Sequence, residues 1–318
     1  MNHISLITIN FNSHSHTIKL LQSIEEIEKK DMKFSVIIVD NASVKKSVDI
    51  IREYINKQQK GKSYDLILLE NKENIGFSGG NNKGILYALH KLQSTHVLLI
   101  NNDTILDKKI LIELLNCSEA SSIGIVTSKI YFAKGHEFYK NRYNNKELGN
   151  ILWYAGGIID WKNMVGMHRG VDEVDNQQYD KVEDTDFASG CCILIKKEIL
   201  EKVGMLDERF FLYYEDSDYS IRVKKSGYRV IYCPKAIMWH NNAGSTGGSG
   251  SNLQDYYITR NRLLFGMQYA PLRTKVALLK EAIKLLFSGR QWQKKGILDF
   301  FRGEFFKGSF KSFPEIIK

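Results

Sequence analysis

The stretch HVLLINNDT at residues 96–104 decides the fold. It is apolar on most of its early positions and ends in Asn101, Asn102 and Asp103. Such apolar runs are typical of parallel strands that helices cover on both faces. In open sheets of this kind, ligands bind at the carboxyl ends of the strands. We therefore expect a buried strand at 96–102, with functional side chains at its end.

Four further apolar runs have the same character, and segments of helical character lie between them. The runs are ISLITIN (4–10), FSVIIVD (34–40), YDLILLE (64–70) and IGIVTSKIYF (123–132). The connecting helical segments lie at 17–30, 44–60, 80–93 and 107–120. This alternation predicts an α/β fold with a doubly wound, mostly parallel sheet.

Polar residues follow each of the first four predicted strands, as NFNS, DNAS, ENKENIGFSGGNN and NNDT. A dinucleotide-binding fold would carry GxGxxG in the first turn and a P-loop would carry GxxxxGK[ST], and NFNSHSH fits neither pattern. The strand ends nevertheless meet at one edge of the predicted sheet. They supply the ligand-binding candidates Asn10, Asp40, Asn41, Asn74, Gly76, Asn101, Asn102 and Asp103.

Several of these candidates have both a chemical and a structural interpretation. Asp40 could accept a hydrogen bond from the N–H of a uracil or thymine ring, or from ribose. Asp103 could hold a divalent cation, because hard cations prefer oxygen ligands and often share them with phosphate. Alternatively, Asp103 caps the following helix with help from Thr104. Gly76, beside Asn74, could bring backbone amides close to a ligand, although each is more typical of a turn.

Length and composition limit the class of protein. The chain has 318 residues, 43% of them hydrophobic, which suffices for one large α/β domain with an extra element. No apolar stretch approaches the ~20 residues that cross a bilayer, and the first residues lack the pattern of a signal peptide. The cysteines show neither a CxxC pair nor zinc-type spacing, so we expect packing residues in a reduced cytosol. They are Cys117, Cys191, Cys192 and Cys233.

The net charge of +9 lies wholly in the C-terminal part, where residues 260–318 carry 13 Lys and Arg against four acids. An amphipathic helical stripe runs through Leu272, Val276, Leu279, Ile283 and Leu286. These helices either pack as a cap on the main domain or dock on an anionic bilayer, where each basic residue contributes about 1 kcal/mol. Nucleic acid is not an expected partner, because no helix-turn-helix, zinc-finger or RNP motif accompanies the basic residues.

The stretch YYEDSDY at 213–219 places Glu215, Asp216 and Asp218 beside aromatic residues. Partial desolvation would disfavour a charged carboxylate, which is how a general base gains a usable pKa. Alternatively, all three are helix-start charges that favour the positive end of the helix dipole. Further on, His240 could bind a metal through neutral imidazole or serve a structural role.

Five motifs in order resemble the inverting family 2 glycosyltransferases of GT-A fold, particularly the bacterial rhamnosyltransferase-like branch. They are VIIVDNAS, ENIGFSGGNNKGI, LLINNDT, ASGCCILIKKEILEKVGMLDERFFLYYEDSDYSIR and WHNNAGS. The resemblance implies a GT-A catalytic domain at 1–246, with a nucleotide-sugar half at about 1–132 and an acceptor half at about 133–246. A basic helical extension at 247–318 follows. The Gly/Ser-rich segment NNAGSTGGSGSN marks a domain boundary or a mobile lid.

The resemblance implies a role for each group of candidates. Asp40 and the other strand-end residues would bind the nucleotide sugar. Asp103 and His240 would hold Mg²⁺ or Mn²⁺. Asn101 stands where the family's DXD motif has its first acid, which removes one charge and puts metal dependence in question.

In the acceptor half, Asp216 would be the catalytic base, and Glu215 would orient the loop or the acceptor. Gly190, Tyr214 and Trp239 would contact the acceptor. The aromatic residues Tyr213, Tyr214 and Trp239 are equally plausible as a sugar platform and as part of the core.

The implied reaction is a single in-line displacement. It would move rhamnose from dTDP-rhamnose, or a hexose from a UDP-sugar, onto a lipid-linked oligosaccharide or surface polysaccharide precursor. The protein would be cytoplasmic and peripheral on the inner face of the cell membrane, and a homodimer is compatible with it. One alternative is a non-catalytic sugar-nucleotide or glycan-binding module of the same fold. Another is a nucleotidyltransferase, which would need a Gly-rich, Arg/Lys-bearing first loop that NFNSHSH does not offer.

Overall fold

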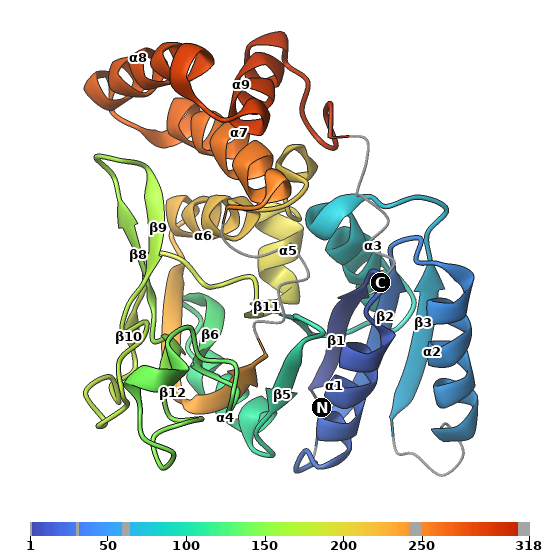
Figure 1. The fold of residues 1–318 in the computed structure, drawn as a ribbon. Helices are drawn as coiled ribbons and strands as arrows, with labels where there is room; N and C mark the ends of the chain where they lie inside the picture. Colours follow the sequence, from blue (N-terminus) through green and yellow to red (C-terminus); the bar gives the residue numbers. More distant parts are fainter. Residues whose placement is uncertain (1, 30–31, 59–63, 242–249, 311–318) are drawn as a thin grey trace.

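The computed structural model of the chain describes residues 2–29, 32–58, 64–241 and 250–310. Within these residues, ten strands form one mixed sheet of order β10-β12-β6-β11-β4-β1-β2-β3, with β5 paired to β12 and β7 to β6 (Figure 1). The strands are β1 (His3–Asn10), β2 (Lys33–Asp40), β3 (Asp65–Glu70), β4 (His96–Ile100), β5 (Thr104–Leu106), β6 (Ile123–Phe132), β7 (Leu152–Tyr154), β10 (Glu183–Asp184), β11 (Cys192–Lys196) and β12 (Arg229–His240).

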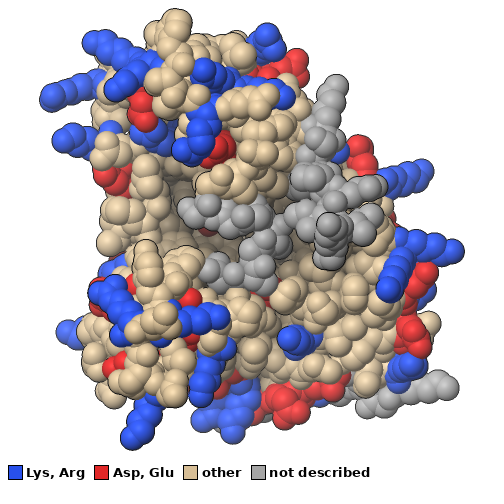
Figure 2. Space-filling model, in the orientation of Figure 1, with Lys and Arg blue, Asp and Glu red and all other residues tan. Residues whose placement is uncertain are grey.

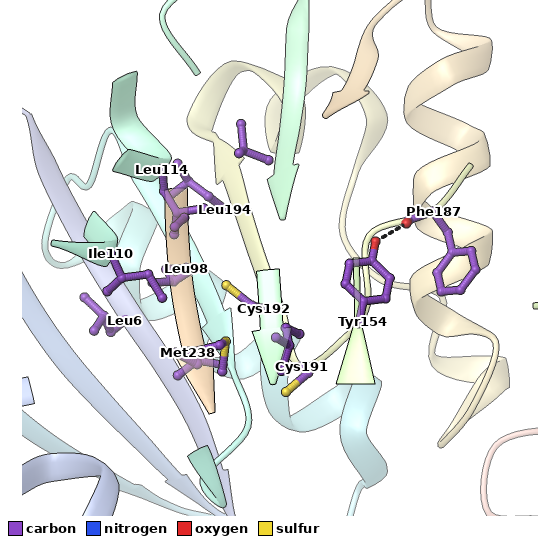
Figure 3. Packing of buried hydrophobic residues seen from close by; sticks show 14 of the residues in the cluster. Leu6, Leu98, Ile110, Leu114, Tyr154, Phe187, Cys191, Cys192, Leu194 and Met238 are labelled. Carbon is purple, nitrogen blue, oxygen red and sulfur yellow. Dashed lines mark hydrogen bonds between the residues drawn. The ribbon is translucent and has the colours of Figure 1, made fainter. Parts of the chain in front are cut away.

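Helices cover both faces of the sheet. Helices α1 (His14–Glu25), α2 (Lys45–Gln58) and α4 (Ile110–Ser118) contribute to one buried cluster, and α3 (Gly76–His90), α5 (Lys197–Val203) and α6 (Glu215–Lys225) contribute mainly to the other. Successive residues of a strand point to opposite faces, so Leu98 joins the first cluster and Leu99 the second. This explains why the strands are apolar on nearly every position. Figure 3 shows Leu6, Leu98 and Leu194 packed with Ile110 and Leu114 of α4.

The parallel pairing aligns the strand ends that carry the predicted site. Strand β1 pairs in parallel with β2 and β4, and Asn10 lies opposite Asp40 in the register. Strand β11 lies between β4 and β6 and runs antiparallel to both. The four N-terminal strands predicted from the sequence are therefore confirmed, and their carboxyl ends share one edge of the sheet.

The sequence pattern of LWYAGGIIDW (152–161) allows a hairpin, but the two halves of this segment do not pair with each other. Strand β7 pairs with β6, and the hairpin follows it as β8 (Gly157–Asp160) with β9 (Val165–His168). Gly156 has φ +110, a conformation open to glycine at little cost, so the chain turns here between β7 and β8. The apolar pattern marked both strands but could not indicate the partner of each.

A disulfide joins Cys117 of α4 to Cys233 of β12, whereas Cys191 and Cys192 are buried free thiols. The prediction that all four cysteines are packing residues is therefore wrong for the first pair. The two bonded cysteines are 116 residues apart in the sequence, so their spacing could not predict the disulfide. Since disulfides persist mainly in oxidising compartments, the cysteines no longer support the predicted reduced cytosol.

The C-terminal helices α7 (Asn252–Tyr269), α8 (Leu272–Ser288) and α9 (Gln291–Arg302) lie beyond α6 at the top of Figure 1. Helix α7 contributes Leu263, Leu264 and Phe265 to the same buried cluster as the sheet. The predicted boundary or lid falls mostly on residues 242–249, which lie outside the described residues. None of the helices described combines the length and hydrophobicity that a bilayer-spanning segment needs.

Candidate active site

A buried polar network joins the carboxyl ends of β1, β2 and β4. The Asn10 side-chain amide donates to Asp40 Oδ2 at 2.7 Å, and the Ser43 backbone amide donates to Asp40 Oδ1 at 2.8 Å. Asn102 donates to Ser13 Oγ at 2.7 Å and to Thr17 Oγ1 at 2.9 Å. Asn10 and Asp40 are almost fully buried, at 0% and 1% exposed. These contacts bring the predicted strand-end residues together and hold Asp40 in one orientation.

The start of α3 connects this network to the other half of the sheet. Asn74 Oδ1 accepts from the Gly76 amide at 2.9 Å, and Asn41 donates to the Gly76 carbonyl at 2.8 Å. Gly76 has φ +76, and a Cβ there would lie 2.5 Å from both the ring and the carbonyl oxygen of Phe211. The Phe77 amide donates to that carbonyl at 2.7 Å. Glycine is therefore required here by close packing against a loop 135 residues away in sequence.

Asp103 and His240 meet as predicted. His240 Nε2 lies 3.2 Å from Asp103 Oδ1, and both residues are buried, at 6% and 7% exposed. Thr104 begins β5, which pairs with β12 so that Thr104 lies opposite His240. Helix α4 begins only at Ile110, with Lys109 at its N-cap. The helix-cap alternative for Asp103 is therefore wrong.

This pair offers one carboxylate oxygen and one imidazole nitrogen, a donor set that suits Mn²⁺ or Mg²⁺ when phosphate oxygens complete the shell. His240 Nδ1 is buried without a hydrogen-bond partner in the described part of the chain. Among those residues, no third His, Cys, Asp or Glu joins a metal-binding group. A cation held by these two residues would therefore need further oxygen ligands, such as those of a phosphorylated ligand.

Trp153, which was not predicted to be part of the site, packs against His240. The Trp153 ring meets His240 edge-on at 4.6 Å between centroids and meets His168 at 4.3 Å. Burial lowers the pKa of His168 to about 4, so this imidazole is neutral at physiological pH. Trp153 was overlooked because it lies in the segment where sequence periodicity is weakest.

The three carboxylates at the start of α6 occupy different environments. Asp216 Oδ2 accepts from the Gly190 amide at 2.9 Å, and Oδ1 accepts from the Ser217 amide at 2.6 Å. Asp218 is fully buried, where it pairs with Arg222 at 2.8 Å and accepts from Tyr269 Oη at 2.6 Å. Asp218 is thus a structural residue. The three carboxylates are not interchangeable helix-start charges.

Burial raises the pKa of Asp216 above its ordinary value, even though backbone amides of Gly190 and Ser217 oppose the shift. Burial raises the pKa of Glu215 much further, and the neighbouring Asp216 carboxylate adds to this shift. Glu215 Oε2 has no hydrogen-bond partner among the described residues. Asp216 is only partly buried as a residue, and it combines a raised pKa with an oriented carboxylate, which is the combination a general base needs.

Gly190 lies between Asp216, at the start of α6, and the segment after β4 that carries Asp103. The Gly190 backbone amide donates to Asp216 Oδ2, and the adjacent Cys191 carbonyl accepts from the backbone amide of Asn101 at 3.2 Å. The Gly190–Cys191 segment therefore lies between the base candidate and Asn101, which follows β4 and is two residues before Asp103. Gly190, predicted to contact the acceptor, holds the carboxylate through its own backbone.

The two aromatic acceptor candidates have partners within the fold. Tyr214 donates to the Met164 carbonyl at 3.0 Å, and its ring packs against Phe265 of α7. Trp239 Nε1 donates to the Gly149 carbonyl at 2.9 Å, and its ring stacks with Tyr131. Both side chains are partly buried and packed against the main cluster. Their contact with an acceptor stays a prediction.

Comparison with known proteins identifies relatives over most of the chain. The family profile described as "Glycosyltransferase like family 2" matches residues 2–265. The low-salt glycan biosynthesis hexosyltransferase Agl10 of Haloferax volcanii is 25% identical over 261 residues, which are 82% of this chain and 74% of that protein. An N-acetylglucosaminyl-diphospho-decaprenol L-rhamnosyltransferase of Mycobacterium tuberculosis is 42% identical over 59 residues, 19% of each chain.

Solved structures resemble the fold at low sequence identity. The mannosyltransferase PcManGT of Pyrobaculum calidifontis, solved with GDP-Man and Mn²⁺, gives a TM-score of 0.55 at 16% identity and covers 94% of this chain and 74% of that one. GalNAc-T7, solved with UDP, GalNAc and Mn²⁺, gives 0.61 at 13% identity and covers 92% and 58%. At these identities the likeness shows the fold alone, and it confirms the GT-A fold expected from the sequence.

Proposed function

We propose that the chain, which belongs to glycosyltransferase like family 2, transfers a sugar from a nucleoside-diphosphate donor to an acceptor hydroxyl with inversion at the anomeric carbon. The observation that carries the proposal is the Gly190–Cys191 link. Gly190 binds Asp216, whose pKa is raised, and Cys191 binds the backbone of Asn101 just after β4. Two residues further along, Asp103 pairs with His240. A base and a diphosphate-binding pair at one edge of a sheet suit a single displacement.

Each group of residues has a task in this mechanism. The network around Asp40 binds the nucleoside, with the carboxylate oriented by Asn10 and Ser43. Asp103 and His240 would hold a divalent cation, which supplies charge stabilisation for the departing diphosphate. Asp216 removes the proton from the acceptor hydroxyl as its oxygen attacks the anomeric carbon, and the bond to the diphosphate breaks on the opposite face.

The donor is proposed from the relatives and remains a choice between two classes. The rhamnosyltransferase match favours dTDP-rhamnose, and the hexosyltransferase match favours a hexose nucleotide such as a UDP-sugar. A panel of nucleotide sugars tested by thermal unfolding with and without Mn²⁺ distinguishes them. A ligand at 100 times its Kd stabilises the fold by about 2.7 kcal/mol. A panel in which no nucleotide sugar stabilises the protein would refute the proposal.

Donor turnover distinguishes an enzyme from the non-catalytic alternative. A glycosyltransferase should slowly hydrolyse its donor even without the correct acceptor, releasing nucleoside diphosphate. A sugar-nucleotide or glycan-binding module should bind the donor and release none. Asp216→Asn is the control for a contaminating hydrolase.

We also propose that α8 docks the protein on an anionic membrane that presents a lipid-linked acceptor. Helix α8 packs through Leu278 and Ala282, which are 2% and 1% exposed. Three residues of the predicted apolar stripe are turned outward, since Leu272, Val276 and Ile283 are 78%, 45% and 53% exposed. Leu286, at the end of the stripe, packs against the main cluster as the cap alternative requires, whereas the three exposed residues are left for contact with a membrane.

Basic residues flank this stripe on the helix. Arg273, Lys280 and Lys284 follow stripe residues at spacings that place them beside it. Figure 2 shows Lys and Arg side chains gathered over the C-terminal helices at the top of the molecule. Apolar side chains beside basic ones suit insertion at the boundary between lipid headgroups and acyl chains.

Ile283→Glu should abolish binding to vesicles that contain phosphatidylserine, because it places a negative charge in the stripe without touching the packed face. Val182→Glu is the matched control, since Val182 is 55% exposed and Ile283 is 53% exposed. Co-sedimentation at low and high salt measures the effect. If the wild-type protein stays in the supernatant at both salt concentrations, or if both variants bind equally well, the membrane proposal fails.

A further inference from the structure

The loop from Arg209 to Tyr214 has an unusual backbone immediately before the carboxylates of α6. Phe211, Tyr213 and Tyr214 have φ values of 41, 70 and 74. None of them is glycine, and L-residues rarely adopt this region because Cβ crowds the backbone. Such conformations persist only where the surroundings determine them. The groups that hold this loop therefore decide where Glu215 and Asp216 point.

Helix α7 supplies most of those groups through one side chain. The Asn261 amide Nδ2 lies 2.8 Å from the Phe210 carbonyl, 2.8 Å from the Leu212 carbonyl and 2.9 Å from the Tyr213 carbonyl. Asn261 is completely buried. The two N–H hydrogens of a single amide are thus shared among three carbonyls of the loop, of which that of Phe210 also accepts from the Leu212 amide.

The neighbouring Arg260 orients the Asn261 side chain and donates a hydrogen bond to the Arg209 carbonyl of the loop. Arg260 Nε donates to Asn261 Oδ1 at 3.0 Å, which orients the amide so that Nδ2 faces the loop. Its Nη2 donates to the Arg209 carbonyl at 3.2 Å. Arg260 is also fully buried, with its guanidinium 5.0 Å from the centroid of the Tyr257 ring. The Phe211 carbonyl accepts from the Phe77 amide of α3, and the Tyr214 carbonyl accepts from the Asp218 amide of α6.

We propose that Asn261, oriented by Arg260, is a positioning residue that sets the catalytic carboxylate of Asp216. The proposal rests on the proposed glycosyl transfer for its kinetic part. It assigns the first C-terminal helix to the catalytic machinery, although the sequence placed the boundary of the catalytic domain at residue 246. The match of the family profile to residue 265 is consistent with this assignment.

The main test is Asn261→Ala. Removing the amide takes one donor away from three carbonyls, so the loop should relax and the Asp216 carboxylate should move from the position it needs for proton transfer. A displacement of about 1 Å costs about 100-fold in rate, and we expect a loss of kcat of about that size. The affinity for nucleoside diphosphate with Mn²⁺ should stay within about twofold, because the donor-binding residues lie on other elements.

Two further variants separate positioning from simple destabilisation. Tyr256→Phe removes the hydroxyl bound to Asp299, which is also 3.5 Å from Arg260 Nη1, but it leaves in place the contacts of Asn261, including the one from Arg260 Nε. It should lower the melting temperature with little change in kcat. Asn261→Gln keeps an amide and should recover part of the kcat lost in Asn261→Ala, although its extra methylene is harder to pack. Equal losses of kcat in Tyr256→Phe and Asn261→Ala at similar melting temperatures would overturn the proposal.

Hydrogen exchange tests the positioning without reference to activity. Amides in peptides that cover 209–218 should exchange faster in Asn261→Ala than in the wild type, and Tyr256→Phe should show no such local change. Unchanged exchange in these peptides would overturn the proposal. If the wild type turns over no nucleotide sugar, the proposed function fails, whereas the exchange result still decides whether Asn261 holds the loop. If Asn261→Ala does not fold, the same comparison is made between Asn261→Gln and Tyr256→Phe.

Discussion

Asp216→Asn should lower turnover by about 10² to 10⁴ while leaving donor affinity nearly unchanged. The substitution keeps the size of the side chain and one carbonyl oxygen that can face the Gly190 amide. It removes the group that would accept the proton of the acceptor hydroxyl. The measurement is the rate of transfer to a defined acceptor, with nucleoside-diphosphate affinity determined in parallel by calorimetry.

Glu215→Gln and Asp218→Asn are the comparison variants. Asp218 is bound by Arg222 and Tyr269, so its substitution should lower the melting temperature more than it lowers the rate at a temperature where the variant is folded. Glu215→Gln tests whether the neighbouring buried carboxyl takes part in the chemistry. Near-wild-type turnover in Asp216→Asn, or abolition by a folded Asp218→Asn alone, would contradict the assignment of the base.

The pH profile gives the same assignment an independent check. A base must be deprotonated to work, so activity should fall as the pH falls through the pKa of Asp216. Burial raises that pKa above the ordinary 3.8 of an aspartate, so the acid limb should lie above the usual carboxyl range. This limb should disappear from the residual activity of Asp216→Asn.

Asp103→Ala should weaken nucleoside-diphosphate binding at least about tenfold in the presence of Mn²⁺, because it removes the carboxylate from the pair with His240. Without metal the two proteins should bind the nucleotide more similarly. Calorimetric titration with Mg²⁺, with Mn²⁺ and with a chelator measures both conditions.

Asp107→Ala is the matched control for Asp103→Ala. Asp107 lies four residues further along and accepts from the Lys109 amide at 2.8 Å, just before α4 begins. It is therefore an acid at a helix start, the role that was the alternative for Asp103. Equal affinity of the wild type and Asp103→Ala in Mn²⁺ would remove Asp103 from the metal site.

The sequence predicted those parts of the site that repeat a local pattern. Each N-terminal strand is an apolar run with polar residues at its end, so parallel pairing alone brings Asn10 and Asp40 together. The contact between Asp103 and His240 was predicted only from the family resemblance. The two residues are 137 positions apart, so no local pattern relates them. Strand β5, which aligns this pair, is too short to give a periodic signal.

The contacts that could not be predicted are long-range and use the backbone. Asn261 binds three carbonyls, groups that every residue possesses, so no pattern of side chains marks its target. The amphipathic stripe of α8 was recognised, but periodicity does not tell which face packs inward. Leu278 and Ala282 bury the helix because Gly266 on α7 leaves room for the Leu278 side chain.

The contact between Gly76 and Phe211 limits how this enzyme can be recombined with its relatives. The proposed donor-binding residues lie mainly before residue 132, which invites chimeras that exchange this half to change the sugar. However, any side chain at position 76 would collide with the Phe211 ring, and the Phe77 amide needs the Phe211 carbonyl. A chimera should therefore be built with the 74–78 turn and the 209–214 loop taken from the same parent, so that the exchanged unit is discontinuous in sequence.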